Sequence, residues 1–543
     1  MGRRRDSRTK VELGDFQTPP ELAAEVCRVL AGRGVAPRSI VEPTCGTGGL
    51  LVAALDGFRG VERALGVDIN GAHVQALQRQ VRARGDGDRV TAEQGSFFEL
   101  DWEARLAELP GPILVIGNPP WVTSADLGQL GSANLPRKSN FHGRAGIEAR
   151  TGKSNFDISE WMLIQLLGWL ERRDATLAML CKSAVARKAL AFGWQAGYRI
   201  GDAAMYRVDA ERCFGASVDA CLLVCALGGA AEAAAPRCRT YESLASERPR
   251  GALGYQDGYL LADLEKYERW KVLARESSYP QQYPYQWRSG IKHDCAAVME
   301  LRREGAGYRN GAGEVVEIED ELVYPMLKSS DVARGDAAHG DAAELTRFML
   351  VTQRSVKEDT AGIERTAPRT WRYLVERRAR FERRASSIYR GKPPFSIFGV
   401  GAYTFAPWKV AISGLYKKLA LRVVGPHGGK PVVLDDTCYF LACESEAEAR
   451  LLAELLASEP ARELYGAFVF WDAKRPITTE ILRRLDLRRL AELLGRGREL
   501  AWLSARGCGA EGPALGGGAE HGPLGGGPEP ASAPALGGVV ERG

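Results

Sequence analysis

The sequence has no uninterrupted apolar run that reaches the roughly 18 residues of a membrane-spanning helix. The start, Met1–Asp6, lacks the apolar core of a signal peptide, and Asp6 stands where a myristoylation signal has Ser or Thr. The 11 cysteines are scattered, and the closest spacing, Cys221 to Cys225, lies in an apolar run typical of a strand. We therefore expect a cytoplasmic protein with reduced thiols, no metal and no membrane partner.

The excess of positive charge is also small. Lys and Arg total 73 against 68 Asp and Glu, a net charge of +5, which excludes a histone-like polycation but allows a local basic cleft. With 543 residues, 45% hydrophobic and 26% charged, the chain is long enough for two or three soluble domains with sizeable cores.

The first 230 residues alternate short apolar runs with helical patterns, which predicts an α/β fold with a doubly wound parallel sheet over residues 14–230. The predicted strands are Ser39–Glu42, Ala64–Ile69, Ile113–Gly117, Thr176–Cys181 and Ala220–Ala226. An Ala-rich break at Gly228–Pro236 marks a domain boundary. Residues 255–490 are richer in aromatic residues and clustered Arg, and the Gly- and Pro-rich segment 507–543 is predicted to be a disordered tail.

A glycine-rich turn follows the first predicted strand, in the sequence Ile40–Gly49 (IVEPTCGTGG), and a helix begins directly after it. Glycine in such a turn lets the backbone approach a ligand closely. Asp68 ends the second predicted strand, where nucleotide-binding sheets hold ribose hydroxyls. Each signal alone fits an ordinary turn or a solvated Asp, but the two together favour an adenosine-containing ligand.

The sequence Asn118-Pro119-Pro120-Trp121 follows the strand Ile113–Gly117. Two prolines stiffen the backbone and remove its N–H donors. The Asn118 amide oxygen and the Pro119 carbonyl can then accept both hydrogens of an exocyclic amine, while Trp121 can stack on the base that carries it. The structural alternative is a Pro-Pro turn with a core tryptophan. These four residues are the predicted catalytic group.

The chain contains three motifs in a fixed order, namely EPTCGTG, GVD and NPPW. Together they resemble the adenine-N6 DNA methyltransferases of restriction–modification systems. The resemblance is to the subclass that has the cofactor motifs first and the target-recognition domain last. The resemblance implies a Rossmann-like sheet, a mixed α+β target-recognition domain at 255–490, S-adenosyl-L-methionine as cofactor, and double-stranded DNA from which adenine is flipped. It further implies that Trp121 and Phe214 stack on the base. The cofactor-binding residues that motifs and resemblance predict are Phe16, Thr18, Glu42, Thr44, Gly46, Gly48, Asp68, Ile69, Ser96, Phe97 and Asp157.

One segment departs from the family pattern. The family usually has Asp-Phe after the third strand, and this Asp binds the adenine amine of the cofactor. The present chain has Ser96-Phe97 instead. Ser96 can accept one hydrogen bond, and Glu99 or Asp101 could substitute from a shifted register.

Two segments are predicted to contact DNA. The tetrapeptide Lys-Ser-Asn-Phe occurs twice in a polar insertion, beginning at Lys138 and Lys153, and combines groups suited to phosphate, base edges and stacking. The run Trp371–Lys392 carries eight Arg or Lys against two Glu. Within it, Arg377, Arg380 and Arg384 would share one helix face. The alternatives are a chance repeat in a solvated loop and a solvated helix face.

The resemblance leaves rival functions open. A cytosine-N4 methyltransferase also methylates an exocyclic amine held by such acceptors, but that family more often has Ser at the position of Asn118. RNA or protein N-methyltransferases are generally compact, so the long second half disfavours them. A bifunctional methylase–nuclease is disfavoured because we find no convincing nuclease site in the second half and no room before the leading motif. A separately encoded restriction endonuclease is a candidate partner, and the expected location is cytoplasmic, with the nucleoid.

Overall fold

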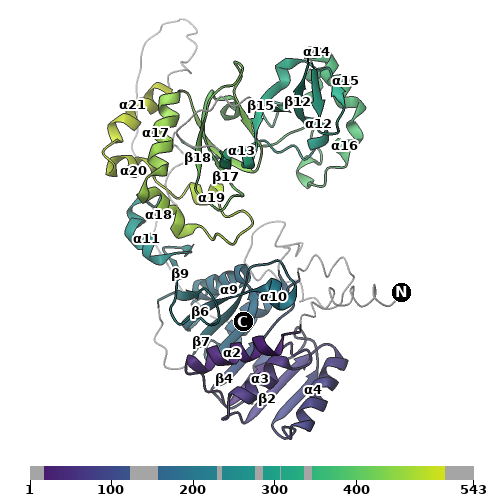
Figure 1. The fold of residues 1–543 in the computed structure, drawn as a ribbon, viewed down its shortest axis with the longest axis vertical. Coiled ribbons are helices and arrows are strands. Elements are labelled where there is room, and N and C mark those ends of the chain that lie inside the picture. The colour runs from purple at the N-terminus through teal and green to yellow at the C-terminus, as the bar shows by residue number, and fades with distance from the viewer. Residues whose placement is uncertain are drawn as a thin grey trace, which may run out of the picture.

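The computed structural model describes residues 17–122, 157–228, 235–275, 285–305, 307–334 and 345–507. These residues form two units stacked along the long axis of the molecule (Figure 1). The predicted residues Phe16, Lys138 and Lys153, both Lys-Ser-Asn-Phe segments and residues 508–543 of the tail lie outside the described ranges, whereas Gly507 ends a helix. None of the described helices is long and apolar enough to cross a membrane.

The first unit is built on a ten-stranded sheet of order β10-β9-β8-β6-β7-β5-β4-β1-β2-β3. Neighbouring strands among the first five are parallel, and β7 runs antiparallel to both β5 and β6. The strands are β1 Ser39–Glu42, β2 Arg63–Asp68, β3 Val90–Gln94, β4 Ile113–Gly117, β5 Ala175–Lys182, β6 Ile200–Val208, β7 Ala220–Leu227, β8 Arg237–Tyr241, β9 Gly251–Gln256 and β10 Tyr259–Leu261.

Helices cover both faces of this sheet, which confirms the predicted doubly wound α/β fold. Side chains of α2, α3 and α4 join one hydrophobic core, and those of α5, α8 and α9 join another. The helices are α2 Pro20–Gly32, α3 Gly49–Gly57, α4 Gly71–Ala83, α5 Trp102–Ala107, α8 Ile158–Leu170, α9 Ser183–Gln195 and α10 Ala210–Phe214.

The sheet differs from the sequence prediction in several respects. It is mixed and not wholly parallel, because β7 runs antiparallel to β5 and β6. β3 was not among the predicted strands, since Thr91, Glu93 and Gln94 make it largely polar. β6 was not among the predicted strands, because Gly201 and Asp202 interrupt its apolar pattern. The sheet also continues through β8, β9 and β10 to Leu261, beyond the predicted domain end at residue 230. β8 pairs in parallel with β6, so the chain after the Ala-rich break remains part of the first unit.

The second unit is mixed α+β, as predicted, and contains two further sheets. One has the order β11-β20-β17-β18 and the other β14-β13-β12-β16-β15-β19. The strands are β11 Arg288–Ser289, β12 Glu300–Glu304, β13 Gly307–Asn310, β14 Val315–Val316, β15 Val323–Leu327, β16 Arg347–Leu350, β17 Trp408–Ser413, β18 Leu421–Val424, β19 Val433–Leu434 and β20 Cys438–Cys443. The helices are α11 Leu264–Trp270, α12 Ala296–Met299, α13 Ser329–Arg334, α14 Ile363–Thr366, α15 Pro368–Glu376, α16 Arg378–Glu382, α17 Glu446–Ala457, α18 Glu459–Phe468, α19 Thr479–Leu482, α20 Leu487–Leu493 and α21 Gly497–Gly507.

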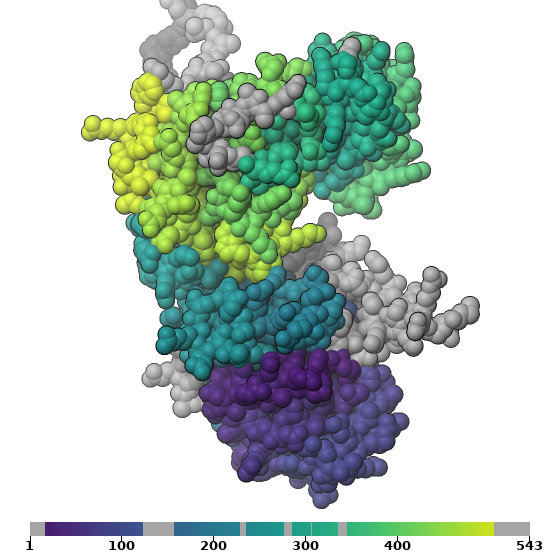
Figure 2. Space-filling view, viewed as in Figure 1, coloured from purple at the N-terminus to yellow at the C-terminus, as the bar shows by residue number. Residues whose placement is uncertain are grey.

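Direct contacts join the two units. Arg187 on α9 donates to Asp472 at 2.7 Å, and its guanidinium lies 4.4 Å from the ring centroid of Phe470. In addition, the backbone N–H of Ala262 donates to the carbonyl of Ala467 at 2.7 Å. Figure 2 shows the green and yellow second unit seated on the teal part of the first. These contacts fix the position of the second unit relative to the sheet of the first.

Candidate active site

A glycine turn connects β1 to α3 at the carboxyl edge of the sheet. Gly46 and Gly48 have φ of +51° and +90°, a region that side chains rarely adopt. A Cβ on Gly46 would lie 2.7 Å from the Gln17 amide, and one on Gly48 would lie 2.4 Å from Leu77. Both positions therefore require glycine, and the segment at Gln17 packs directly on the turn.

Asp68, at the end of β2, ties the neighbouring strand ends together. Its Oδ2 accepts the backbone N–H of Gly46 and its Oδ1 that of Asn70, both at 2.8 Å. His73 Nδ1 lies 3.4 Å from Oδ1. The two backbone hydrogen bonds fix the position of the Asp68 carboxylate. Because a carboxylate offers about four lone-pair sites, it can still accept hydrogen bonds from a ligand.

Glu42, the last residue of β1, is a buried carboxyl group beside this turn. Its Oε2 accepts the backbone N–H of Leu51 at 2.9 Å. Burial, with a smaller contribution from the charge of Asp68, raises the pKa of Glu42 well above its usual value. The neighbouring Thr44 hydroxyl is buried and has no hydrogen-bond partner among the described residues.

A pocket of about 810 Å³, its open mouth included, lies at the ends of β1, β2 and β4. Nine of the sequence-predicted site residues line it, namely Thr18, Glu42, Thr44, Gly46, Asp68, Ile69, Phe97, Asn118 and Pro120. Six other described catalytic, cofactor-binding or base-stacking candidates lie outside its lining, namely Gly48, Ser96, Pro119, Trp121, Asp157 and Phe214. Sequence patterns did not predict four lining residues whose side chains bear on the site, namely Gln17, His73, Phe98 and Met162. Gln17 lies between two predicted residues and Phe98 directly follows the predicted Phe97, whereas nothing in the sequence marks His73 or Met162.

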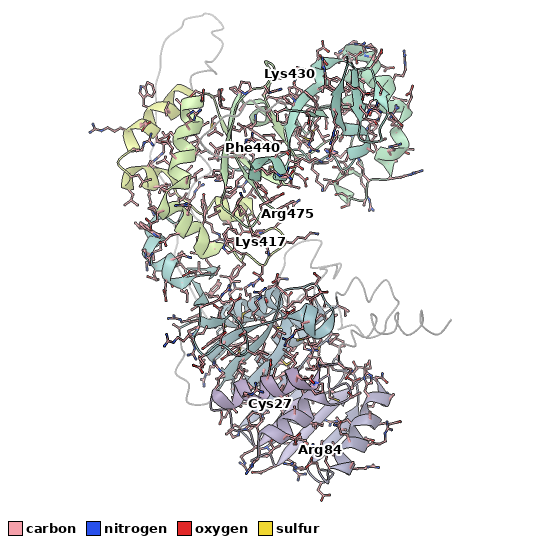
Figure 3. The ribbon with its side chains drawn as sticks, in the orientation of Figure 1. Cys27, Arg84, Lys417, Lys430, Phe440 and Arg475 are labelled. Carbon is pink, nitrogen blue, oxygen red and sulfur yellow. The ribbon has the colours of Figure 1, made fainter. Side chains whose placement is uncertain are left out.

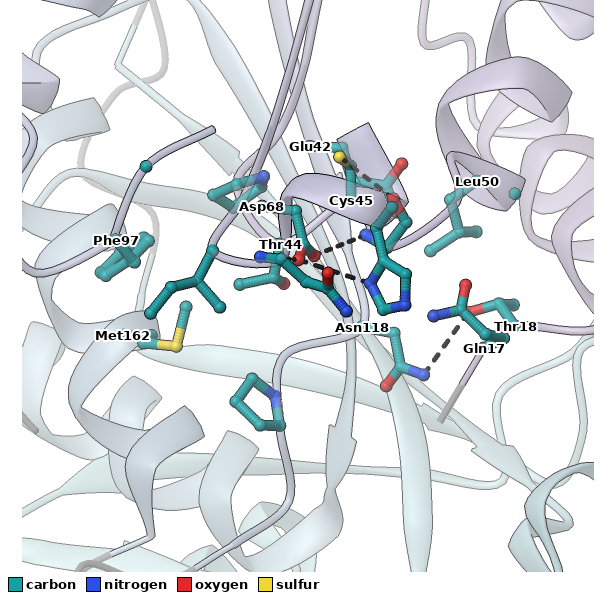
Figure 4. Close-up of a pocket in the computed structure, with 18 of the residues that line it drawn as sticks. Gln17, Thr18, Glu42, Thr44, Cys45, Leu50, Asp68, Phe97, Asn118 and Met162 are labelled. Carbon is teal, nitrogen blue, oxygen red and sulfur yellow. Dashed lines mark hydrogen bonds and ion pairs between the residues drawn. The ribbon is translucent and has the colours of Figure 1, made fainter. Parts of the chain in front are cut away.

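Asn118 lines the pocket and directly follows the last residue of β4. Its Nδ2 donates to Thr18 Oγ1 at 3.4 Å, and Figure 4 shows the two side chains next to each other. This contact orients the amide with its nitrogen toward Thr18 and its oxygen away from it. The segment before α2 and the segment after β4 are thereby linked across the pocket.

Trp121 and Phe214 are in contact, but not as parallel plates. Their ring centroids are 5.2 Å apart with planes at 73°, an edge-to-face arrangement. Trp121 is buried, and its indole N–H donates to the Leu180 carbonyl at 3.3 Å. The structure brings the two predicted stacking residues together, yet it leaves no base-wide gap between their rings.

Asp157 begins α8 and forms a network that the sequence did not reveal. Its Oδ1 accepts the backbone N–H of Ser159 at 3.1 Å, and its Oδ2 pairs with Lys182 Nζ at 2.6 Å. The same ammonium donates to the carbonyl oxygen of Trp121 at 2.9 Å. The carboxylate of Asp157 is therefore engaged with α8 and β5, and Lys182 connects it to the Asn-Pro-Pro-Trp segment.

Ser96 and Phe97, which follow β3 where the family usually has Asp-Phe, lie in two different environments. Ser96 Oγ accepts the backbone N–H of Phe98 at 3.3 Å, so this hydroxyl stabilises the local turn. Phe97 is buried in an aromatic cluster, with its centroid 5.3 Å from that of Trp102. Ile69 is 39% exposed and provides an apolar wall on the open side of the pocket.

The three arginines of the predicted DNA track do not share a helix face. Helix α15 ends at Glu376 and α16 begins at Arg378, because the backbone leaves the helical region at Arg377. Arg377 pairs with Glu314 at 2.8 Å. Arg384 donates to the carbonyls of Phe381, His293, Ser396 and Pro394, and burial lowers its pKa. Arg380 remains exposed, 3.9 Å from a carboxylate oxygen of Glu314.

A curated relative identifies the family of the chain, although no family model matches it. The Type II methyltransferase M.NspV of Nostoc sp. is 42% identical over 487 residues, which is 90% of this chain and 98% of that protein. The chain belongs to the Type II methyltransferases. A further member, M.XamI of Xanthomonas campestris pv. amaranthicola, is 29% identical over 116 residues, 21% of each chain.

Similarity of fold extends over both units. The structure of the Type IIL restriction–modification enzyme MmeI in complex with DNA matches 94% of this chain and 74% of its own, with a TM-score of 0.53 and 12% identity. The family and this Rossmann-like fold confirm the restriction–modification methyltransferase class expected from the sequence. They also support S-adenosyl-L-methionine as the cofactor.

The described pocket fits this cofactor in its donor set and shape. The buried Thr44 hydroxyl and the Asp68 carboxylate offer polar partners, and the glycine turn lets the backbone approach a ligand. Ile69 and Phe98 add apolar side chains to the lining, as a purine ring needs. The lining therefore combines polar acceptors and donors with apolar surface, which is compatible with an adenosine-containing sulfonium.

Proposed function

We propose that the chain is a site-specific DNA methyltransferase that transfers a methyl group to the N6 amine of an adenine flipped out of the duplex. The observation that carries this proposal is the position of Asn118, which lines the same pocket as Asp68 and is held by Thr18. An amide acceptor thus lies beside the pocket proposed for the methyl donor. Flipping is needed because an enzyme cannot reach the amine inside the base stack.

In this proposal Asp68 binds the ribose hydroxyls, while Ile69, Phe97 and Phe98 flank the adenine ring of the cofactor. Thr18 and the glycine turn bind its methionine end. When bound, S-adenosylmethionine would supply a methyl group from its positively charged sulfonium. The amine nitrogen would form a C–N bond as the C–S bond breaks, S-adenosylhomocysteine would leave, and one amine proton would pass to solvent.

Asn118 and Pro119 act on the target amine. The Asn118 amide oxygen and the Pro119 carbonyl accept its two hydrogens, which raises the electron density on the nitrogen and aims its lone pair into the pocket. Because the methyl donor is already activated, the protein contributes mainly alignment and preorganised acceptors. Pro120 keeps the backbone extended so that both acceptors face one point.

Trp121 and Phe214 would enclose the adenine ring. Since the two rings are in edge-to-face contact, base binding requires one of them to move, and Phe214 is the better candidate. It is half-buried at the end of α10, a five-residue helix, whereas Trp121 is buried and hydrogen-bonded to β5.

The second unit would read the target sequence, with double-stranded DNA as the partner. This follows the fold shared with MmeI, whose structure was solved with DNA. The enzyme would act in the cytoplasm on nucleoid DNA and protect it from a separately encoded restriction endonuclease. Adenine is favoured over cytosine-N4 as the target because Asn, and not Ser, occupies position 118.

The test is to incubate the purified protein with S-adenosylmethionine carrying a CD3 group and plasmid DNA, and to analyse the digested nucleosides by mass spectrometry. Labelled N6-methyl-2′-deoxyadenosine is the expected product. Label only in N4-methylcytosine would reject the adenine assignment. Label in RNA or protein, with none in DNA, would reject DNA as the substrate.

A further inference from the structure

A cleft separates the two units close to the proposed target-base site. It has about 1360 Å³ of open space and is lined by both units. Ser183 lies in its wall and directly follows Lys182, whose ammonium binds the Trp121 carbonyl. The cleft therefore begins one residue beyond the lysine that contacts the Asn-Pro-Pro-Trp segment, and Lys417 lies on the opposite side of the cleft.

Most positive charges in this cleft already have partners. Arg187 pairs with Asp472, and Lys266 pairs with Asp263 at 3.2 Å. Arg207 and Arg250 both pair with Glu242, at 3.0 and 2.7 Å. Among the described residues, no carboxylate pairs with Lys417, the remaining cation of the lining, or with the adjacent Lys418.

Lys417 and Lys418 belong to the loop between β17 and β18. The four consecutive residues Leu415, Tyr416, Lys417 and Lys418 are all exposed, with Leu415 at 36% and Tyr416 at 39%. Figure 3 shows Lys417 on the side of the second unit that faces the first. An apolar and aromatic tip beside two exposed ammonium groups is suited to the rim of a nucleic-acid groove, where sugar and phosphate alternate.

The base of this loop is held in place by hydrogen bonds. Ser413 Oγ accepts the backbone N–H groups of Leu415 and Tyr416 at 3.2 and 3.3 Å, and it lies 2.8 Å from Ser329 Oγ. The N–H of Gly414 donates to the Thr437 carbonyl at 2.9 Å. A Cβ on Gly414 would lie 2.7 Å from the Tyr439 ring, so the loop packs closely on its own sheet. A loop ordered before binding loses less conformational entropy on binding.

We propose that the β17–β18 loop is a DNA contact, in which Lys417 and Lys418 bind phosphates of the strand that passes the target-base site. The proposal rests on the proposed DNA methyltransferase function and deepens it by naming the surface. It differs from the basic run at Trp371–Lys392, where Arg377 and Arg384 are engaged within the protein. Phosphate is the partner that the charge and the position of the loop favour.

The test compares three variants of the full chain in duplex-DNA binding across a salt series. Lys417→Gln/Lys418→Gln removes both charges, and Lys417→Arg/Lys418→Arg retains them. The control Arg365→Gln/Arg498→Gln removes two exposed charges from α14 and α21, at the far end of the second unit (Figure 1). Titration with S-adenosylhomocysteine checks that each variant keeps a folded cofactor pocket.

The Gln/Gln variant should bind duplex DNA about tenfold more weakly near 0.1 M salt. The slope of log affinity against log salt should flatten by about 0.9 for each phosphate that the variant no longer neutralises. The Arg/Arg variant and the control should resemble the wild type. Equal affinity and slope for Gln/Gln and wild type would overturn the proposal, as would an equal weakening in the control. If the wild type itself binds no DNA, the proposed function fails, which is a separate outcome.

Discussion

Lys182 donates a hydrogen bond of 2.9 Å to the carbonyl oxygen of Trp121, and the same ammonium pairs with Asp157 at 2.6 Å. The end of β5, the start of α8 and the Asn-Pro-Pro-Trp segment are thus connected through one side chain. Lys182 does not line the pocket, so it acts as a positioning residue for the proposed catalytic acceptors.

Replacing Lys182 by Met should lower kcat by about tenfold or more, because small misplacements of reacting groups carry large rate costs. The affinity for S-adenosylhomocysteine should change little. Lys182→Arg keeps the charge and should recover part of the rate. Steady-state kinetics that separate kcat from KM provide the measurement, and an unchanged kcat in Lys182→Met would remove this role.

Asp68→Asn should weaken cofactor binding. Asp68 accepts two backbone N–H groups, and an amide can accept only one of them while its NH2 faces the other donor. We expect binding to weaken by about 1–3 kcal/mol, which is roughly 5- to 150-fold in Kd for S-adenosylmethionine by calorimetry. The control Asp56→Asn, in an exposed pair with Arg84, should bind as the wild type. Wild-type affinity in Asp68→Asn would contradict the assignment.

Glu42 predicts a pH dependence of stability. Its pKa is raised in the folded state, so its contribution to stability is fully present below the unfolded pKa and is lost as pH rises toward the folded value. Glu42→Gln keeps an acceptor for Leu51 and cannot ionise. The variant should therefore gain stability relative to the wild type with increasing pH, by up to about 1.4 kcal/mol per pH unit above about pH 5.

Thermal unfolding of wild type and Glu42→Gln between about pH 5 and 8 measures this difference. The control is Glu62→Gln: the exposed Glu62 pairs with Arg38 and has a lowered pKa, so its contribution to stability is already complete above about pH 5, and the difference between this variant and the wild type should stay constant over the range. A constant difference between Glu42→Gln and wild type across this range would mean that Glu42 is not a perturbed buried acid.

Arg384 should prove structural, and Arg380 should not. Removing the Arg384 guanidinium leaves several carbonyls without their donor and removes its stacking on Tyr389, 3.5 Å from the ring centroid. We expect Arg384→Ala to lower the free energy of unfolding by about 2–3 kcal/mol, against less than about 0.5 for Arg380→Ala. Urea unfolding provides the measurement, and equal values for the two variants would be the contrary result.

Local sequence patterns were sufficient to predict the central strands and the turns that follow them. β1 and β4 are fully buried and apolar except at their ends, so their bounds follow from composition. The glycine turn, Asp68 and Asn118 lie together because the carboxyl ends of parallel strands meet at one edge. The edge-to-face contact of Trp121 with Phe214 depends on side-chain packing that sequence spacing does not specify.

Long-range contacts explain what the sequence did not reveal. Lys182 is one lysine among many until β5 places it beside Trp121 and Asp157. Arg384 fits a basic helix face by spacing, but the break at Arg377 turns it toward carbonyls from distant segments. β6 was missed because Gly201 and Asp202 interrupt its apolar residues, and its pairing with β7 shifts register at the same place.

The central claim is that Asn118 presents an acceptor to the adenine amine beside the cofactor pocket. The most direct test is the rate of N6-methyladenine formation in duplex DNA by wild type and Asn118→Ala, measured by nucleoside mass spectrometry together with S-adenosylhomocysteine affinity. Removal of one preorganised acceptor predicts a rate lower by about 10²-fold or more with cofactor affinity nearly unchanged. Methylation of adenine by Asn118→Ala at the wild-type rate would contradict the account.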